Sequence, residues 1–534
     1  MRRKLFGLLL AATALVACME VRNPATGEIQ YTSMTPEDEK RIGAEENKKA
    51  LAEFGGRYGD AKLQAYVERV GNRVKNASEL ADQNFTFTVL DSDIVNAFAL
   101  PGGYVYVTRG LLALANNEAE LAGVLGHEIG HVTARHTAQR YDRAQVATGG
   151  ALLGTLLGAV AGAYVGGDLG QMIARGVGQG AQTLATAYVQ GYSREQELEA
   201  DQLGIRYLGR AGYDPAAMAT FLEALEANER FEAAHGQAGA AVPDWLRSHP
   251  RTPDRIMAAV RAVSAEQPGA RQENRPDFLA AIDGMIWGED PAQGVVQGRR
   301  FAHPELRIAF EAPYGFTLKN TPAAVIGRDQ RGRFMIFDMA PEPRSADLRS
   351  YLQNEWVTRQ RLQDLQSLSV NGQEAAVGFG QVVVNQKPAM AMFAAVRAPD
   401  GKVYRFLYAK TAQLTRGDVD DFGASLESFR PLSAAEAATL RPLRVEIVPV
   451  RAGDTIDTFA RQMDVEQDPR GIFILLNGLD RGRDLRPGDE VKILKRAPAP
   501  VAGLEPRLAP SPQTGHNAAT VTGRGSGRDG AAVL

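Results

Sequence analysis

Two histidines and a glutamate within five residues are the side chains of this chain best suited to bind a metal. The segment HEIGH (127–131) lies inside LAGVLGHEIGHVTARHTAQR, whose apolar positions and lack of proline predict a helix. His127 and His131 are four residues apart, so they share one helical face and can reach one zinc ion. With 7 His in 534 residues, roughly 0.005 matches to H-E-x-x-H are expected by chance. The spacing therefore predicts a zinc site.

A zinc that catalyses a reaction usually has three protein ligands and one position for water, so a third ligand is expected downstream. The metzincin spacing requires glycine at 134 and histidine at 137, where this chain has Ala134 and Thr137. His136 is offset by one position, and we predict that it is a solvated helix residue. The alternative is a carboxylate on a second helix, and the segment SREQELEAD (193–201) supplies several.

HEIGH followed by SREQELEADQLG resembles the zinc peptidases of the CAAX-prenyl-protease, HtpX and BepA family. The resemblance implies one Zn²⁺ per chain, with Glu197 as its third ligand and Asp201 orienting a ligating histidine. Glu197 and Asp201 are i, i+4 on one helical face, which agrees with those two roles. Glu199 points roughly the opposite way, and Glu195 is the weaker alternative ligand.

Two further segments resemble the same family. NAFALPGGYVYVTRGLL (96–112) resembles its strand block ahead of the zinc helix, which implies that Asn96, Ala97 and Phe98 bind an extended peptide at a sheet edge. The alternative is a core hairpin. SHPRTPDRI (248–256) resembles its S-H-P-x-T-x-x-R-I segment, which implies that His249 reaches the zinc cleft. There His249 would stabilise an oxyanion or occupy the open position on zinc and keep the enzyme latent; the alternative is a loop histidine.

The resemblance implies a metalloendopeptidase in which Glu128 takes a proton from the attacking water and delivers it to the leaving amine. Its implied substrates are misfolded or stalled outer-membrane proteins. The family offers an alternative function, a chaperone or assembly factor for outer-membrane proteins with a latent zinc site. A third hypothesis is a wall-tethering lipoprotein whose protease domain is vestigial.

The N-terminus has a signal-peptide profile over residues 1–17, a basic start followed by the apolar run from Leu5 to Ala17. Cys18, the only cysteine, follows in LVAC, which resembles a bacterial lipobox and implies a lipidated periplasmic protein anchored to the outer membrane. A single cysteine excludes an intramolecular disulfide and Cys-rich zinc fingers. A net charge of -3 gives no basic field for nucleic acid, so no nucleic-acid partner is expected.

We expect an α+β fold with several domains. A mainly helical metallopeptidase domain over 18–290 contains strands at 85–90 and 104–108. A second α+β domain over 297–430 has helices near 345–364 and 416–428. Its sequence contains no motif that indicates a catalytic or binding function. Residues 444–496 resemble a βααβ LysM module, which implies peptidoglycan binding, and the tail 497–534 is expected to be disordered. The glycine-rich segment 149–167 either touches lipid or a membrane-protein substrate, or packs internally.

Overall fold

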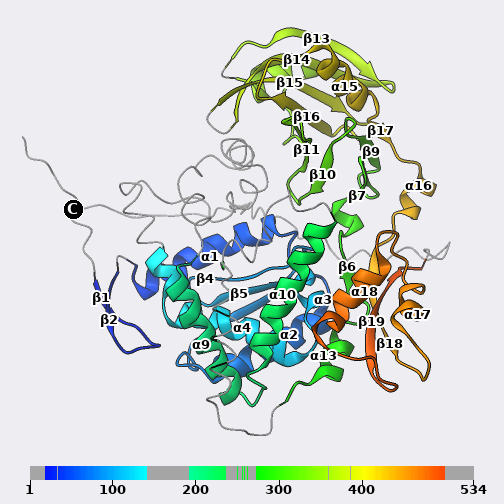
Figure 1. Ribbon diagram of the computed structural model, residues 1–534. Coiled ribbons are helices and arrows are strands. Elements are labelled where there is room, and N and C mark those ends of the chain that lie inside the picture. The colour runs from blue at the N-terminus through cyan, green and yellow to red at the C-terminus, as the bar shows by residue number, and fades with distance from the viewer. Residues whose placement is uncertain are drawn as a thin grey trace, which may run out of the picture. The chain divides into compact units, whose positions relative to one another are not determined.

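The computed structural model describes residues 19–32, 34–140, 192–235, 249, 255, 258, 261, 272–358, 360–384 and 387–498 (Figure 1). Helices and strands are mixed along this part of the chain, which confirms the α+β class. Within the described residues, no helix combines the length and the apolar character that crossing a membrane requires. The predicted leader 1–17, Cys18, the segment 149–167 and the tail from residue 499 lie outside the described residues.

A short sheet forms the centre of the N-terminal region. Strand β3 (Thr86–Leu90) runs parallel to β5 (Tyr104–Thr108), and β4 (Ala97–Leu100) pairs antiparallel with the other side of β5, so β4 is an edge strand. The strands predicted at 85–90 and 104–108 are therefore confirmed, and β4 is a third. The chain turns between β4 and β5 at Gly102 and Gly103, whose φ angles of 80° and 84° suit glycine.

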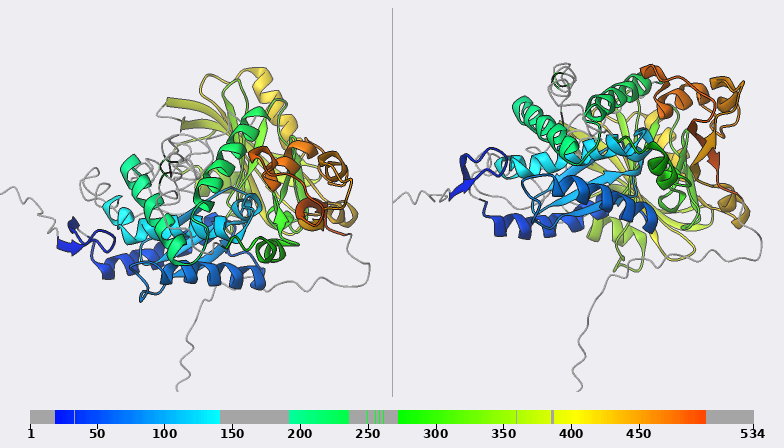
Figure 2. Two further views of the ribbon diagram at one scale, coloured as in Figure 1. Left: turned by 60° about the horizontal axis from the view of Figure 1, so that its bottom comes forward. Right: turned by 90° about the horizontal axis from the view of Figure 1, so that it is seen from below.

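Helices cover both faces of this sheet. Because successive strand residues point to opposite faces, Tyr106 packs with Phe54 on one side, whereas Val107 joins the large core that contains Leu125 on the other. Helices α9 and α10 flank α4, as Figure 2 shows. The helices of this region are α1 (Pro36–Glu53), α2 (Ala61–Asn76), α3 (Arg109–Leu114), α4 (Glu118–Thr133), α9 (Arg194–Arg210) and α10 (Ala217–Ala234).

Glycines allow α4 and α9 to approach each other closely. A Cβ added to Gly126 of α4 would lie 3.3 Å from the Cα of Gly204 in α9. A Cβ added to Gly204 would lie 3.0 Å from the backbone nitrogen of His127. Because neither residue has a side chain, the two backbones can come into contact, and the polar side chains of the next turn of α4 converge with those of the preceding turns of α9.

The chain next forms two antiparallel sheets and several short helices. The seven-stranded sheet has the order β10 (Thr317–Asn320), β11 (Val325–Arg328), β12 (Arg333–Met339), β16 (Val403–Lys410), β15 (Lys387–Arg397), β14 (Gln373–Val384) and β13 (Gln363–Val370). The four-stranded sheet has the order β17 (Arg430–Pro431), β9 (Ile308–Glu311), β8 (Arg300–His303) and β7 (Val295–Gln297).

Of the two helices predicted in this region, one is confirmed and one is wrong in length. Helix α15 (Arg416–Glu427) occupies the predicted span. The helix predicted over 345–364 is only α14 (Leu348–Tyr351) and a π-helical turn to Trp356, and β13 follows. The Gln353 side chain explains the early end, because its amide donates to the carbonyl oxygens of Val357 and Gln360 at 3.2 and 2.9 Å. These carbonyls therefore have partners without a continuing helix.

Residues 443–496 form a strand, two helices and a strand: β18 (Leu443–Pro449), α17 (Ile456–Ala460), α18 (Pro469–Asn477) and β19 (Glu490–Arg496). Strand β18 pairs antiparallel with β19 and also with β6 (Ile286–Trp287), which follows α13 (Arg275–Ile282). Phe459, Phe473 and Ile493 belong to the same continuous hydrophobic core as Leu125 of α4. This βααβ unit is therefore packed as part of the body that carries the HEIGH helix.

Candidate metal centre

Helix α4 places the two predicted histidines on one buried face. The Asn117 side chain caps its N-terminus by accepting from the backbone N–H of Glu120, and the acidic first turn suits the positive end of the helix. The rings of His127 and His131 meet one turn before the C-terminus, with their Nε2 atoms 3.0 Å apart. The sequence prediction that both histidines share a helical face is confirmed by this geometry.

Glu197, from the first turn and a half of α9, completes the predicted ligand set. Its Oε1 lies 3.4 Å from His131 Nε2, and its Oε2 lies 3.6 Å from His127 Nε2. Around a tetrahedral zinc with bonds of about 2.0–2.2 Å, neighbouring ligand atoms are roughly 3.4 Å apart. The three side chains therefore already have the spacing of a zinc site.

His249 joins this group as a fourth potential ligand. Its Nδ1 is 3.1 Å from His127 Nε2 and 3.0 Å from Glu197 Oε1. One ligand atom from each of His127, His131, Glu197 and His249 lies within 4.8 Å of the others, and all four residues are buried. The sequence is compatible with His249 as a zinc ligand, an oxyanion contact or a loop histidine, and this geometry favours the first of these roles.

Asp201 and Arg255 hold the ligands from outside. Asp201 Oδ1 lies 2.9 Å from His127 Nδ1, the ring nitrogen that faces away from the other ligands. The Arg255 guanidinium donates twice to Asp201, at 2.7 and 2.8 Å, and its Nη1 is 2.7 Å from Glu197 Oε2. Burial by itself would raise the pKa of Asp201, but Arg255 and His127 lower it below its usual value. Both carboxylates are therefore kept ionised.

The net negative charge buried in this centre is best neutralised by a divalent cation. Glu128, Glu197 and Asp201 are at most 2% exposed, and Arg255, at 1%, is the buried cation that faces them. If the histidines are neutral, as metal ligands must be, these four groups carry a net charge of -2 when all three carboxyl groups are ionised, and a low-dielectric site tolerates that charge only with a counterion. Two or three imidazoles with one carboxylate suit Zn²⁺, and the residues therefore fit the predicted cofactor.

Glu128 lies beside this group without a hydrogen bond. Neither carboxylate oxygen has a hydrogen-bond partner in the part of the chain that the structure describes, and the side chain is fully buried. His249 Nε2 lies 3.5 Å from Glu128 Oε1. Burial raises the pKa of Glu128, with His249 and His127 opposing the shift. Such a carboxylate is suited to accept a proton from a water or substrate bound beside the ligands.

The residues predicted to bind a peptide lie on and beside strand β4, which packs against α4. Asn96 is 5% exposed, and no hydrogen-bond donor among the described residues reaches its Oδ1. Ala97 is buried, and Phe98 is half-buried with its ring stacked on Tyr106 at 4.6 Å. The structure thus places these residues at a sheet edge next to the zinc helix, and their contact with substrate stays a prediction.

Sequence reasoning misjudged His136 and missed Arg255. His136 is 1% exposed, so the prediction of a solvated position is wrong. That prediction assumes a helix that continues unbroken past His131, whereas α4 ends at Thr133 and helical residues resume at His136 after a turn. Arg255 stood in the SHPRTPDRI segment, but that segment drew attention to His249 alone. The signal for Arg255 is its basic side chain, because its segment is expected to enter a cleft rich in carboxylates.

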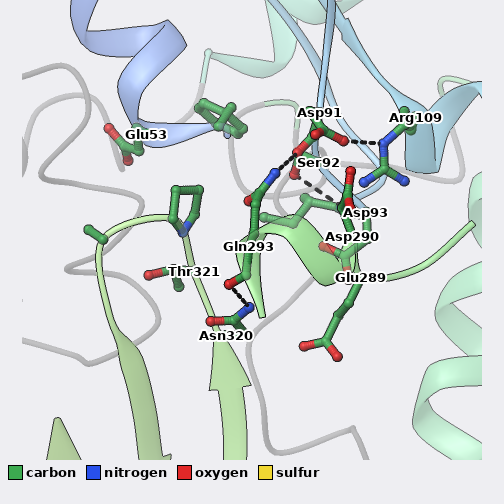
Figure 3. A pocket seen from close by; sticks show the side chains of 14 residues that line it. Glu53, Asp91, Ser92, Asp93, Arg109, Glu289, Asp290, Gln293, Asn320 and Thr321 are labelled. Carbon is green, nitrogen blue, oxygen red and sulfur yellow. Dashed lines mark hydrogen bonds and ion pairs between the residues drawn. The ribbon is translucent and has the colours of Figure 1, made fainter. Parts of the chain in front are cut away.

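A second acidic cluster lines a cavity of about 70 Å³ where the 289–293 segment meets the loop after β3 (Figure 3). Asp91 accepts from Arg109 Nε at 2.6 Å, and Gln293 donates to the Asp91 carbonyl oxygen at 2.9 Å. Glu289 accepts from the backbone N–H of Val296 at 2.7 Å. These carboxylates have protein partners, so the cluster acts as a structural junction.

A buried His-Glu-x-x-His helix whose histidines face a glutamate on a second helix defines a metallopeptidase-type centre. A sequence profile described as "Peptidase family M48" matches residues 61–263. The chain is also 30% identical over 258 residues to the "Mitochondrial metalloendopeptidase OMA1" of Schizosaccharomyces pombe, covering 47% of this chain and 69% of that protein. The chain belongs to peptidase family M48, as the sequence resemblance implied.

Bacterial relatives match the same region. The chain is 32% identical over 229 residues to the "Beta-barrel assembly-enhancing protease" of Yersinia pestis, and 31% identical over 224 residues to that of Escherichia coli K12. These matches cover 42% and 41% of this chain. The chain spans less than half the length of both relatives, 43% in each case.

Proposed function

We propose that this protein is a zinc-dependent endopeptidase that hydrolyses peptide bonds of envelope proteins. The observation that carries the proposal is the buried group of His127, His131 and Glu197, beside which lies the carboxylate of Glu128, with no hydrogen-bond partner among the described residues. Zinc bound by those three ligands would act as a Lewis acid and lower the pKa of a coordinated water to about 7.

The chain's own residues would then move the proton. Glu128 accepts it from the water as the oxygen attacks the peptide carbonyl carbon, and donates it to the amine as the C–N bond breaks. One water is consumed, its hydroxyl ending on the new carboxyl group and its proton on the new amine. Asp201 fixes the orientation of the His127 ring, and Arg255 holds Glu197 and Asp201 in place.

Strand β4 is the proposed binding edge for substrate. An extended peptide would pair with the strand that carries Ala97 and Phe98, next to Asn96. Main-chain pairing of this kind tolerates many sequences, as clearance of misfolded proteins requires. The name of the bacterial relatives, beta-barrel assembly-enhancing protease, supports β-barrel proteins as substrates, and we propose that these are proteins of the outer membrane.

The proposals for location and further partners rest on two sequence resemblances. We propose that lipidated Cys18 anchors the protein to the outer membrane on its periplasmic side, and that the βααβ unit binds peptidoglycan. The strand-helix-helix-strand order of residues 443–496 is consistent with the LysM resemblance. Palmitate labelling of the protein with and without Cys18→Ser tests the lipid anchor. A pull-down with peptidoglycan tests glycan binding by the βααβ unit.

A second candidate function is an assembly factor for outer-membrane proteins with a latent zinc site. The position of His249 favours it, because Nδ1 lies as close to His127 and Glu197 as a fourth ligand would. Four protein ligands close a zinc site to water, whereas three leave a position open. His249 would then have to leave before catalysis.

Zinc content and casein cleavage, measured on protein that starts at Met19, separate the two functions. We expect wild type to bind one zinc, Glu128→Gln to bind zinc without cleaving, and His249→Ala to cleave faster. Glu226→Gln, the same change at a partly exposed pair with Arg230, is the matched control and should cleave like wild type. Cleavage retained by Glu128→Gln would refute the mechanism. Zinc-bound protein that is inert in all forms would favour the assembly factor.

A further inference from the structure

A chain of three polar side chains leads from the zinc-binding candidate His131 toward the surface. His131 Nδ1 lies 2.9 Å from His136 Nδ1, and His136 Nε2 lies 3.1 Å from Glu199 Oε2. His131 and His136 are at most 1% exposed, whereas the Glu199 side chain is 36% exposed. His131 comes from the end of α4, His136 from the first helical residue after the turn at 134–135, and Glu199 from α9.

The backbone at Arg135 makes this contact possible. In a continuous helix a residue five positions on lies about 140° around the axis, so His136 would face away from His131. Helix α4 instead ends at Thr133, and Arg135 adopts a left-handed φ of 57°. Its side chain is held by Glu39 at 2.6 Å and by the Met34 carbonyl oxygen at 3.0 Å. The chain thereby turns back, and His136 reaches the ring of His131.

Only one arrangement of protons satisfies this chain when a metal is bound. His131 Nε2 faces the other ligands, so the ring's proton is on Nδ1, which donates to His136 Nδ1. His136 must then carry its own proton on Nε2, which donates to Glu199. A carboxylate acceptor favours that tautomer of His136. The Tyr192 ring, stacked on His131 at 3.7 Å, fixes the plane of the ligand ring.

We propose that His136 is a positioning residue for the metal, which orients His131 and sets its tautomer, and that Glu199 in turn sets the tautomer of His136. The inference rests on the proposed zinc site and deepens it. It makes the two ligating histidines unequal, since His127 contacts the buried carboxylate of Asp201 directly, whereas His131 reaches a carboxylate only through a second imidazole.

Zinc affinity, measured by competition with a chromogenic chelator on the protein from Met19 onward, tests this proposal without any substrate. His136→Leu leaves the buried Nδ1–H of His131 without an acceptor, and we expect zinc to bind about 10–100-fold more weakly. His136→Asn places an amide oxygen where Nδ1 was and should recover most of the affinity. Glu199→Ala, at a partly exposed position, should weaken zinc binding at least threefold.

His235→Leu is the matched control. His235 also bonds a carboxylate, Asp468, at 3.0 Å, and it follows the end of α10 as His136 follows α4. The zinc affinity of the His235→Leu variant should equal that of wild type. Absorption of the Co²⁺-substituted protein adds a readout of ligand geometry, and we expect its visible bands to change in His136→Leu but not in His136→Asn.

The proposal is overturned if His136→Leu binds zinc within twofold of wild type, or if His136→Asn binds as weakly as His136→Leu. If His136→Leu does not fold, Glu199→Ala decides in its place, because zinc affinity within twofold of wild type in that variant would overturn the proposal. Wild type that binds zinc and shows these shifts but cleaves nothing would refute the proposed endopeptidase alone. Wild type that cleaves, with affinities unchanged in all variants, would refute the role of His136 alone.

Discussion

Lys492 offers a test of whether the βααβ unit and the zinc helix form one cooperative body. This residue of β19 is 0% exposed, and its Nζ donates to the carbonyl oxygens of Ala113 and Ala115 at 2.8 and 2.7 Å. Both carbonyls are at the C-terminus of α3, immediately before α4 begins at Glu118. The perturbation is Lys492→Met, which keeps the length of the side chain and removes its donors.

The magnitude follows from the two acceptors. A buried carbonyl that loses its hydrogen bond costs about 1–3 kcal/mol, so two cost about 2–6 kcal/mol of unfolding free energy. Each kcal/mol shifts the Tm of a domain of this size class by about 2–4 °C. We therefore expect Lys492→Met to lower the Tm by at least about 4 °C.

The loss of unfolding free energy in Lys492→Met should depend on pH. Burial lowers the pKa of Lys492 well below its ordinary value of 10.5. Between the folded pKa and 10.5 the unfolded chain binds a proton that the folded protein does not, so the stability of wild type rises with pH in that window. Methionine carries no such proton. The difference in unfolding free energy between wild type and Lys492→Met should thus grow as pH rises toward 10.5.

Hydrogen exchange measured on β19 and α4 separately is the assay. We expect Lys492→Met to speed the exchange of both elements together, because they share one core. Lys495→Met, on the same strand at 38% exposure, should exchange like wild type. Faster exchange of β19 with α4 unchanged would refute the argument, because the unit would then open by itself.

Two other perturbations test the buried charges. Arg255→Met removes the guanidinium that faces the buried carboxylates of Glu197 and Asp201, 0% and 2% exposed, and leaves them only histidine partners. The metal-free protein should therefore lose about 3–5 kcal/mol in urea unfolding, and a loss below about 1 kcal/mol would contradict this. Burial raises the pKa of Glu289 to about 7, although its carboxylate accepts a hydrogen bond from the backbone N–H of Val296. Folding therefore takes up a proton between the unfolded and folded pKa values, so the unfolding free energy should fall as pH rises from 4.5 to 7. Glu289→Gln should remove that slope, worth at most about 3 kcal/mol, and an unchanged dependence of Tm on pH would exclude Glu289 as its cause.

The core of the site could be predicted because it depends on helical periodicity. His127 and His131, and likewise Glu197 and Asp201, are four residues apart, and a helix places such pairs on one face whatever surrounds it. The residue types then limit the chemistry, since two imidazoles and a carboxylate suit zinc. The α+β class was predictable for a similar reason, from local alternation along strands such as β5.

The positions of the other site residues depend on single backbone angles or on contacts between segments that are distant in the sequence. His136 became part of the site because Arg135 leaves the helical conformation, and arginine gives no local indication of a left-handed φ. Arg255 bonds Asp201, 54 residues away, and no pattern in its own segment identifies that partner. His249 was predicted to reach the cleft from the resemblance alone, and its position among the ligands required the structure.

The βααβ unit shows the same limit on a larger scale, with a consequence for the proposed wall binding. Its local pattern predicts two strands and two helices, but not that both edges of β18 are occupied, by β19 and by β6. It also does not predict that α18 packs against α3 and α10, the helices next to α4. If this unit binds peptidoglycan as proposed, no flexible linker separates the glycan from the zinc helix. Glycan binding would then stabilise the whole body, and zinc and glycan should each raise the Tm of a single unfolding transition.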